Sequence, residues 1–180
     1  MRLFVALPIP ATLRSAAAEV VGPLRAGAGE GLRWSDPAGW HVTLAFLGEV
    51  APERCGEAAA VVDAVAASAG PMAMRSGGAG RFGRGVLWLG VDSEPPGLVA
   101  DLGEAVQAGI ETAGLPVERR PVQPHVTLAR GGRGVVTSSL VAAVEVPETA
   151  WAADRIELWS SRLGGGPARY TVEHTAPLQP

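Results

Sequence analysis

Alternation of polar and apolar residues predicts strands in several short parts of this chain, and apolar residues three or four positions apart predict helices in longer parts. Helices are expected at residues 11–24, 52–69, 96–113 and 138–144. Strands are expected at residues 1–7, 40–47, 72–76, 85–91, 122–129, 156–160 and 169–175. This intermixed order predicts an α+β fold with two mainly antiparallel sheets and flanking helices.

Glycine-rich segments mark several connections between these elements. Residues 77–84 are expected to form a turn that carries Arg81 and Arg84, and the strands on either side of it form a hairpin. A run of three glycines at residues 164–166 joins the last two strands in the same way. A mobile turn is expected at Gly131, Gly132 and Gly134, and it carries Arg133.

The string His-Val-Thr-Leu-Ala occurs twice, at residues 41–45 and 125–129, and the two copies contain two of the three histidines. Alternate residues of a strand point to opposite faces. His41 and Thr43 therefore share one face of the first strand, and His125 and Thr127 share one face of the second. A single string of this kind is most often structural, but its duplication favours a functional role.

The two copies lie 84 positions apart, which is too far for a short-period repeat protein. We expect one bilobal domain over residues 1–180, built from two similar halves. If the halves pack symmetrically, the imidazoles of His41 and His125 line one central cleft.

The composition is typical of a protein with one well-buried core, because 47% of the 180 residues are hydrophobic. Pro8 and Pro10 interrupt the apolar run at the start, so the run predicts a strand rather than a signal peptide. No apolar stretch is long enough to span a bilayer. Cys55 is the only cysteine, which excludes an internal disulfide and favours the reducing cytoplasm.

The charge of the chain argues against a protein that coats DNA. Its net charge is −3, and all 15 basic residues are arginines. Binding to many phosphates would require a strong basic excess. A local arginine cluster can still grip one or two phosphates through its planar guanidinium groups.

The paired strings have the chemistry for acid and base catalysis at one phosphorus. Imidazole gives or takes a proton near neutral pH, so two imidazoles on opposite sides of a phosphorus can act together. Threonine hydroxyls and an arginine can hold the nonbridging oxygens, where charge develops. A zinc site is disfavoured, because neither string has metal-ligand spacing or an acidic residue. We expect no metal and no other cofactor.

Beyond the two strings, several segments resemble the bacterial and archaeal RNA 2′,3′-cyclic phosphodiesterases, also called 2′-5′ RNA ligases, of the two-histidine phosphoesterase superfamily. The segments are Met-Arg-Leu-Phe-Val-Ala at residues 1–6, Trp40, residues 43–50, Leu-Trp-Leu-Gly-Val at residues 87–91, residues 124–130, and Leu-Trp-Ser-Ser at residues 158–161. The likeness covers nearly the whole chain in the same order.

The resemblance implies a bilobal fold with pseudo-two-fold halves and hydrolysis of an RNA or nucleoside 2′,3′-cyclic phosphate to a 2′-phosphomonoester, with weak reversible 2′-5′ ligation. His41 would donate a proton to the departing oxygen, and His125 would accept one from water. Thr43, Thr127 and Arg130 would bind the phosphate. The expected partners are RNA ends with a 2′,3′-cyclic phosphate or small cyclic nucleotides. We expect a monomer that takes part in RNA processing and does not bind a membrane.

The residues leave three points open. Strict alternation places Arg130 on the face opposite His125 and Thr127, unless the strand bends. His174, the third histidine, lacks a threonine two positions later and is expected to be structural or at the surface. The function is the third open point. The substrate could instead be ADP-ribose 1″,2″-cyclic phosphate, or the protein could be a nucleotide-binding module without turnover. The repeated string could also be a strand duplication with a purely structural role.

Overall fold

The computed structural model describes residues 1–27, 31–131, 135–162 and 168–179. Their nine strands form one curled sheet in which all neighbours are antiparallel. One half contains, from the centre outward, β3 (His41–Glu49), β1 (Arg2–Pro8), β8 (Arg155–Arg162) and β9 (Arg169–Pro177). The other contains β6 (His125–Gly131), β5 (Val86–Ser93), β4 (Met72–Phe82) and β7 (Ala150–Ala153), and β2 (Leu32–Trp34) also pairs with β6.

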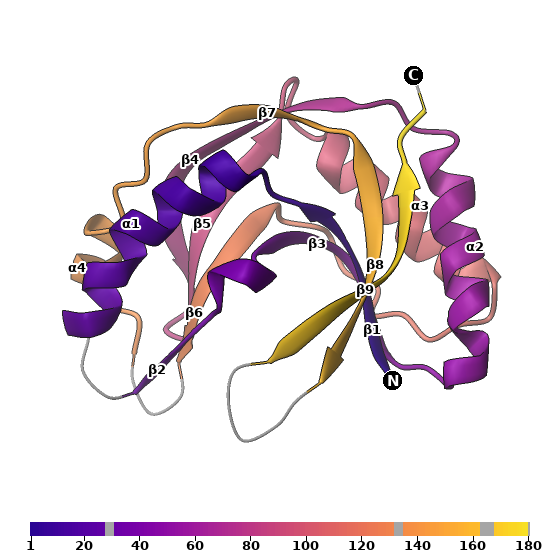
Figure 1. Cartoon of the computed structure of the whole chain (residues 1–180), viewed down its shortest axis with the longest axis horizontal. Helices are drawn as coiled ribbons and strands as arrows, with labels where there is room; N and C mark the ends of the chain where they lie inside the picture. The colour runs from indigo at the N-terminus through magenta and orange to yellow at the C-terminus, as the bar shows by residue number, and fades with distance from the viewer. Residues whose placement is uncertain (28–30, 132–134, 163–167, 180) are drawn as a thin grey trace.

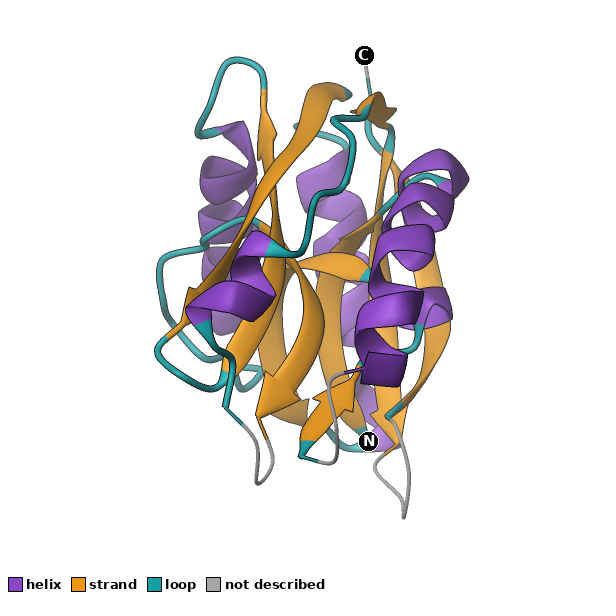
Figure 2. Cartoon of the chain, turned by 90° about the vertical axis from the view of Figure 1, so that its left-hand side faces the viewer, coloured by secondary structure: helices purple, strands orange, loops and turns teal. Residues whose placement is uncertain are grey.

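Helices flank this sheet in both views (Figures 1 and 2). They are α1 (Ala11–Gly27), α2 (Cys55–Ala66), α3 (Leu98–Thr112) and α4 (Ser138–Ala142), with short 3-10 turns at Pro37–Gly39 and Pro52–Arg54. Figure 1 shows α1 and α4 beside the half that contains β4 and β5, and α2 and α3 beside the other half. The α+β architecture with two similar halves is therefore confirmed. In the part of the chain that the structure describes, no helix has the length and apolar character needed to cross a bilayer.

The two predicted sheets are joined into one where β3 meets β6. The register between these strands consists of one residue pair, Val42 opposite Val126. Both valines are fully buried and belong to the main hydrophobic core. The halves thus share a core through the centre of the sheet.

Each copy of the repeated string contains a β-bulge at the same place. In the first copy, β1 pairs with Ala45 and then with Thr43, so Leu44 is the extra residue. In the second, β5 pairs with Ala129 and then with Thr127, so Leu128 is the extra residue. An extra residue shifts the alternation by one, which is why both Leu and Ala of each copy are buried on the core side.

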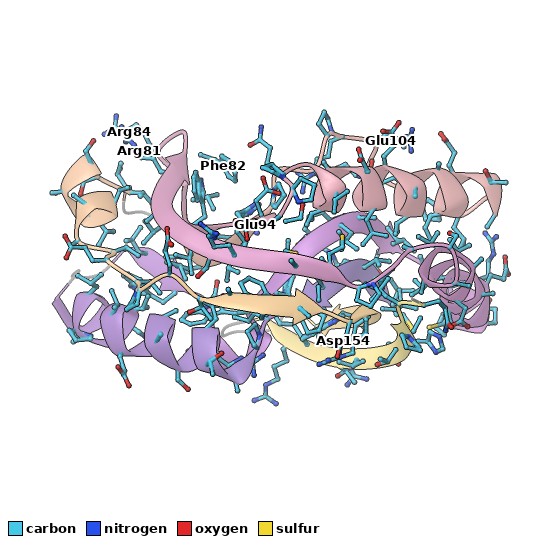
Figure 3. All side chains as sticks on the ribbon, turned by 90° about the horizontal axis from the view of Figure 1, so that it is seen from above. Arg81, Phe82, Arg84, Glu94, Glu104 and Asp154 are labelled. Carbon is cyan, nitrogen blue, oxygen red and sulfur yellow. The ribbon has the colours of Figure 1, made fainter. Side chains whose placement is uncertain are left out.

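The glycine-rich segment expected as a turn is mostly strand. β4 continues to Phe82, with a register shift between Ser76 and Ala79. A side chain at Gly80 would collide with the ring of Trp88. The absent side chains therefore allow close approach of β5, rather than a wide turn. Figure 3 places Arg81, Phe82 and Arg84 together at the end of this hairpin.

Two short strands, β2 and β7, were not predicted, because three or four residues are too few for alternation to be recognised. The second predicted histidine strand begins at His125 rather than at residue 122. The expected glycine turns at residues 132–134 and 164–166 lie outside the described residues.

Gly90→Ala should destabilise the protein. A methyl group at this position would collide with the carbonyl oxygen of Gly77 on β4, so the β4–β5 pair must separate locally. We expect a loss of about 1 to 3 kcal/mol in the free energy of unfolding, measured by urea denaturation. Gly56→Ala is the matched control, because Gly56 lies in the first turn of α2 with open space around it, so the added methyl group should leave the stability equal or slightly higher. Equal stabilities of the two variants would contradict the close approach.

Candidate active site

A cleft of about 1130 Å³ runs along the centre of the sheet, and all five residues proposed from the sequence line it. They are His41, Thr43, His125, Thr127 and Arg130. Because Val42 and Val126 point into the core, their neighbours along each strand point to the opposite face. The single pairing of β3 with β6 therefore brings the two histidine–threonine pairs together on one surface.

Each histidine is held by the same backbone contact. The Nδ1 atom of His41 lies 2.6 Å from the carbonyl oxygen of Gly39, and the Nδ1 atom of His125 lies 2.6 Å from that of Gln123. A carbonyl oxygen only accepts hydrogen bonds, so Nδ1 carries the hydrogen in both rings. In both neutral rings the free lone pair is consequently on Nε2, which is the nitrogen available for proton transfer.

His41 lies in the more enclosed of the two environments. Its ring contacts those of Phe4, Trp159 and Tyr170, with centroid distances of 4.7, 5.4 and 5.5 Å. Burial among these rings lowers the pKa of His41 to about 4, despite the hydrogen bond to Gly39, which favours the charged form. The nearby charges of His125 and Arg130 lower this pKa further.

His125 is also shifted toward the neutral form. Burial is the main cause that lowers its pKa, and the charges of Arg130 and Arg120 add to it, whereas the hydrogen bond to Gln123 opposes it. The ring stands edge-on to Phe82 at 4.9 Å. The two imidazoles thus influence each other in one cleft but differ in their surroundings.

The bulge in β6 decides the position of Arg130. Simple alternation would place this residue on the core side, yet the extra residue Leu128 reverses the alternation from Ala129 onward. Ala129 is buried, and Arg130 lines the cleft with His125 and Thr127. Burial is the main cause of the lowered pKa of both imidazoles, and the charge of Arg130 lowers both pKa values further.

The equivalent position after the first string is occupied by Phe46, which also lines the cleft because β3 has the same bulge. The guanidinium of Arg120 lies 4.9 Å from the centre of the Phe46 ring. Gln107, which is buried in α3, holds this region through hydrogen bonds to the backbone of Leu44 and to both backbone polar groups of Arg120. The two halves therefore present an arginine on one side and an aromatic ring on the other.

Several cleft residues gave no sequence signal. Gly39 and Gln123 act through their carbonyl groups, which no side-chain pattern reveals. Arg33 lies on the short strand β2, and Tyr170 lies on β9 against Gly39. The repeated offset of two residues between each carbonyl and its histidine becomes meaningful only once the strand ends are known.

His174 takes no part in the cleft. Its Nε2 atom lies 2.7 Å from Oδ1 of Asp63, which connects β9 to α2. This contact agrees with the expected structural role. Within the described ranges, no three His, Cys, Asp or Glu side chains gather in a group that could hold a metal ion.

Comparison with known proteins shows which family has this arrangement. The family model described as the 2′-5′ RNA ligase superfamily matches residues 13–165. The chain belongs to this superfamily. It is 28% identical over 181 residues to the RNA 2′,3′-cyclic phosphodiesterase of Geobacillus stearothermophilus, and the match covers 94% of this chain and 55% of that protein. The chain thus spans about half the length of this relative.

Two solved structures have a similar fold over nearly the whole chain. The crystal structure of TT0787 of Thermus thermophilus has a TM-score of 0.79 at 27% identity, and that of Escherichia coli LigT complexed with 3′-AMP has a TM-score of 0.76 at 26% identity. Each comparison covers 99% of this chain and 98% of the other chain.

The lowered pKa of His41 predicts a specific loss of stability in acid. Between its ordinary value of 6.5 and about 4, the unfolded chain binds a proton at this residue that the folded protein does not. The free energy of unfolding should therefore fall as pH drops through this window, by up to about 3 kcal/mol from His41. His41→Gln should lose less stability over the same window in urea denaturation. Parallel curves for both proteins would contradict the buried neutral imidazole.

Proposed function

We propose that this chain hydrolyses RNA or nucleoside 2′,3′-cyclic phosphates to 2′-phosphomonoesters. The observation that carries the proposal is the pair of imidazoles in one cleft, each with Nδ1 held by a carbonyl group and Nε2 left available. The family supports it, since a relative is named RNA 2′,3′-cyclic phosphodiesterase and LigT was crystallised with 3′-AMP.

In the proposed reaction, Nε2 of His125 takes a proton from water while the water oxygen attacks phosphorus. The bond between phosphorus and O3′ breaks, and protonated Nε2 of His41 gives its proton to O3′. One water is consumed, and the products are a 3′-hydroxyl and a 2′-phosphomonoester. Thr43, Thr127 and Arg130 bind the nonbridging oxygens, where negative charge increases in the transition state.

The different surroundings of the two rings support this division of roles. A protonated imidazole with a pKa of about 4 is a strong proton donor, which suits His41. His125 makes its backbone hydrogen bond in a more exposed place, which suits contact with water. A bound phosphate between the rings adds negative charge and so raises both pKa values. The reactive form is the one in which His41 carries the proton and His125 does not.

The same groups would catalyse weak 2′-5′ ligation if the 5′-hydroxyl of an RNA replaced water: His125 would take the proton of this hydroxyl as its oxygen bonds to phosphorus, and His41 would protonate O3′ as the bond between phosphorus and O3′ breaks. Action without a metal, as a single-domain monomer and in the cytoplasm, stays a prediction from the sequence. Comparison of turnover with ADP-ribose 1″,2″-cyclic phosphate would separate the two substrate classes.

His41→Ala and His125→Ala should each reduce kcat for a nucleoside 2′,3′-cyclic phosphate by at least about 10², because each removes one proton-transfer group. The assay is run in EDTA and follows the 2′-phosphomonoester product. His174→Ala is the matched control, since this histidine lies outside the cleft, and it should keep wild-type turnover. A well-folded wild-type protein without turnover would favour the binding module, and turnover lost only in EDTA would contradict the metal-free reaction.

The pH dependence of kcat/KM should be bell-shaped, with its maximum below pH 6.5. This parameter reports the free enzyme, in which the pKa values of both histidines are lowered, so the singly protonated pair is most abundant in mild acid. The maximum of kcat should lie at higher pH, since the bound phosphate raises these pKa values. Steady-state rates from pH 4 to 9 test both statements. A maximum of kcat/KM above pH 7.5 would be inconsistent with the neutral imidazole pair.

A further inference from the structure

Two arginines face each other across neighbouring strands at one end of the cleft. In the pairing of β2 with β6, Arg33 is directly opposite Arg130. The Cα atoms of such partners lie about 4.5 to 5.5 Å apart, and like charges in this position repel each other. The pairing therefore places two arginines directly opposite each other, a position in which like charges are disfavoured.

Both side chains point into the cleft. Directly opposed residues share one face of a sheet, and the bulge at Leu128 turns Arg130 to the cleft face. Arg33 and Arg130 both line the cleft. β2 is fixed there by buried Trp34, which pairs with Ala129, and by the hydrogen bond from Ser35 to the carbonyl group of Leu128.

The described residues provide little negative charge for this pair. The ion pairs among them include neither Arg33 nor Arg130. Among the described residues, four arginines and two carboxylates line the cleft, and one of these carboxylates, Glu118, pairs with Arg120. The cleft is thus locally basic in a chain of net charge −3.

Arg33 lies beyond the reacting centre. The charge of Arg130 acts on both imidazoles. Arg33 lies opposite Arg130, at the end of β6 away from His125 and away from the Val42–Val126 pair that joins β3 to β6. The cleft volume of about 1130 Å³ exceeds the few hundred Å³ that a small ligand needs. A substrate with the cyclic phosphate at the histidines can therefore place another anionic group beside Arg33.

We propose that Arg33 and Arg130 form a second anion subsite, which binds a further phosphate of the substrate: the 5′-phosphate, or the preceding phosphodiester, of the nucleotide that carries the cyclic phosphate. This inference rests on the proposed function and adds a substrate preference to it. Arg130 spans the two positions, and Arg33 acts only on the second phosphate. Guanidinium groups fit this task because their planar donors match phosphate oxygens.

The test compares adenosine 2′,3′-cyclic phosphate with its 5′-phosphorylated form. Wild-type protein should have a lower KM for the 5′-phosphorylated substrate. In Arg33→Gln, the ratio of the two KM values should change about tenfold toward the substrate with one phosphate. Arg33→Lys should recover part of the preference, since it keeps the charge but not the planar donors. Arg25→Gln, at the exposed end of α1, is the matched control and should keep the wild-type ratio.

An unchanged ratio of the two KM values in Arg33→Gln overturns the subsite. This includes the case in which both KM values rise by the same factor, because Arg33 would then act on the reacting phosphate. Folding of the variant is checked by thermal unfolding, where loss of the repulsion should leave the Tm equal or higher.

A binding measurement keeps the subsite testable if the proposed hydrolysis fails. Calorimetry with inorganic pyrophosphate and with inorganic phosphate needs no turnover. The ratio of the two Kd values should change about tenfold in Arg33→Gln relative to wild type. No turnover together with this change would refute the hydrolysis alone, and turnover without it would refute the subsite alone.

Discussion

The pairing of Val42 with Val126 is the contact on which the cleft depends. It joins the two halves of the sheet at one residue pair and sends both valines into the common core. Because side chains alternate along a strand, the same pairing turns the flanking histidines and threonines to the opposite face. A slip of one residue in either strand would bury its imidazole in the core and expose its valine. Core packing therefore fixes the register that assembles the proposed active site.

The similar halves end in different chemistry. The same bulge turns Arg130 and Phe46 to the cleft face, so one side carries a charge and the other an aromatic ring. The histidines share one backbone contact but differ in burial, and the pKa of His41 is lowered to about 4. Acid–base catalysis requires one group that accepts a proton and another that donates a proton in the same step. An approximate symmetry places them together, and its local breaking makes them different.

The sequence predicted the long elements well, because their alternation or helical spacing extends over many residues. Both histidine strands and the halves that contain them follow from the repeated string. The prediction of a turn around Gly77 and Gly80 was wrong. These glycines permit close packing of neighbouring strands, which local propensity does not reveal. β2 was missed for its shortness. Arg33 consequently had no predicted position, and its opposition to Arg130 appears only in the sheet register.

The sequence by itself determined which residues could perform proton transfer and phosphate binding, because two copies of one string supply paired imidazole and hydroxyl groups. It also determined their common face, which follows from the period of a strand. The tertiary structure decided the face of Arg130, since a bulge is defined only by the partner strand. It also decided the lowered pKa of His41, because the burial of this ring depends on rings from β1, β8 and β9 that are remote in the chain. Local pattern specifies side-chain chemistry, whereas register and burial arise from contacts between distant segments.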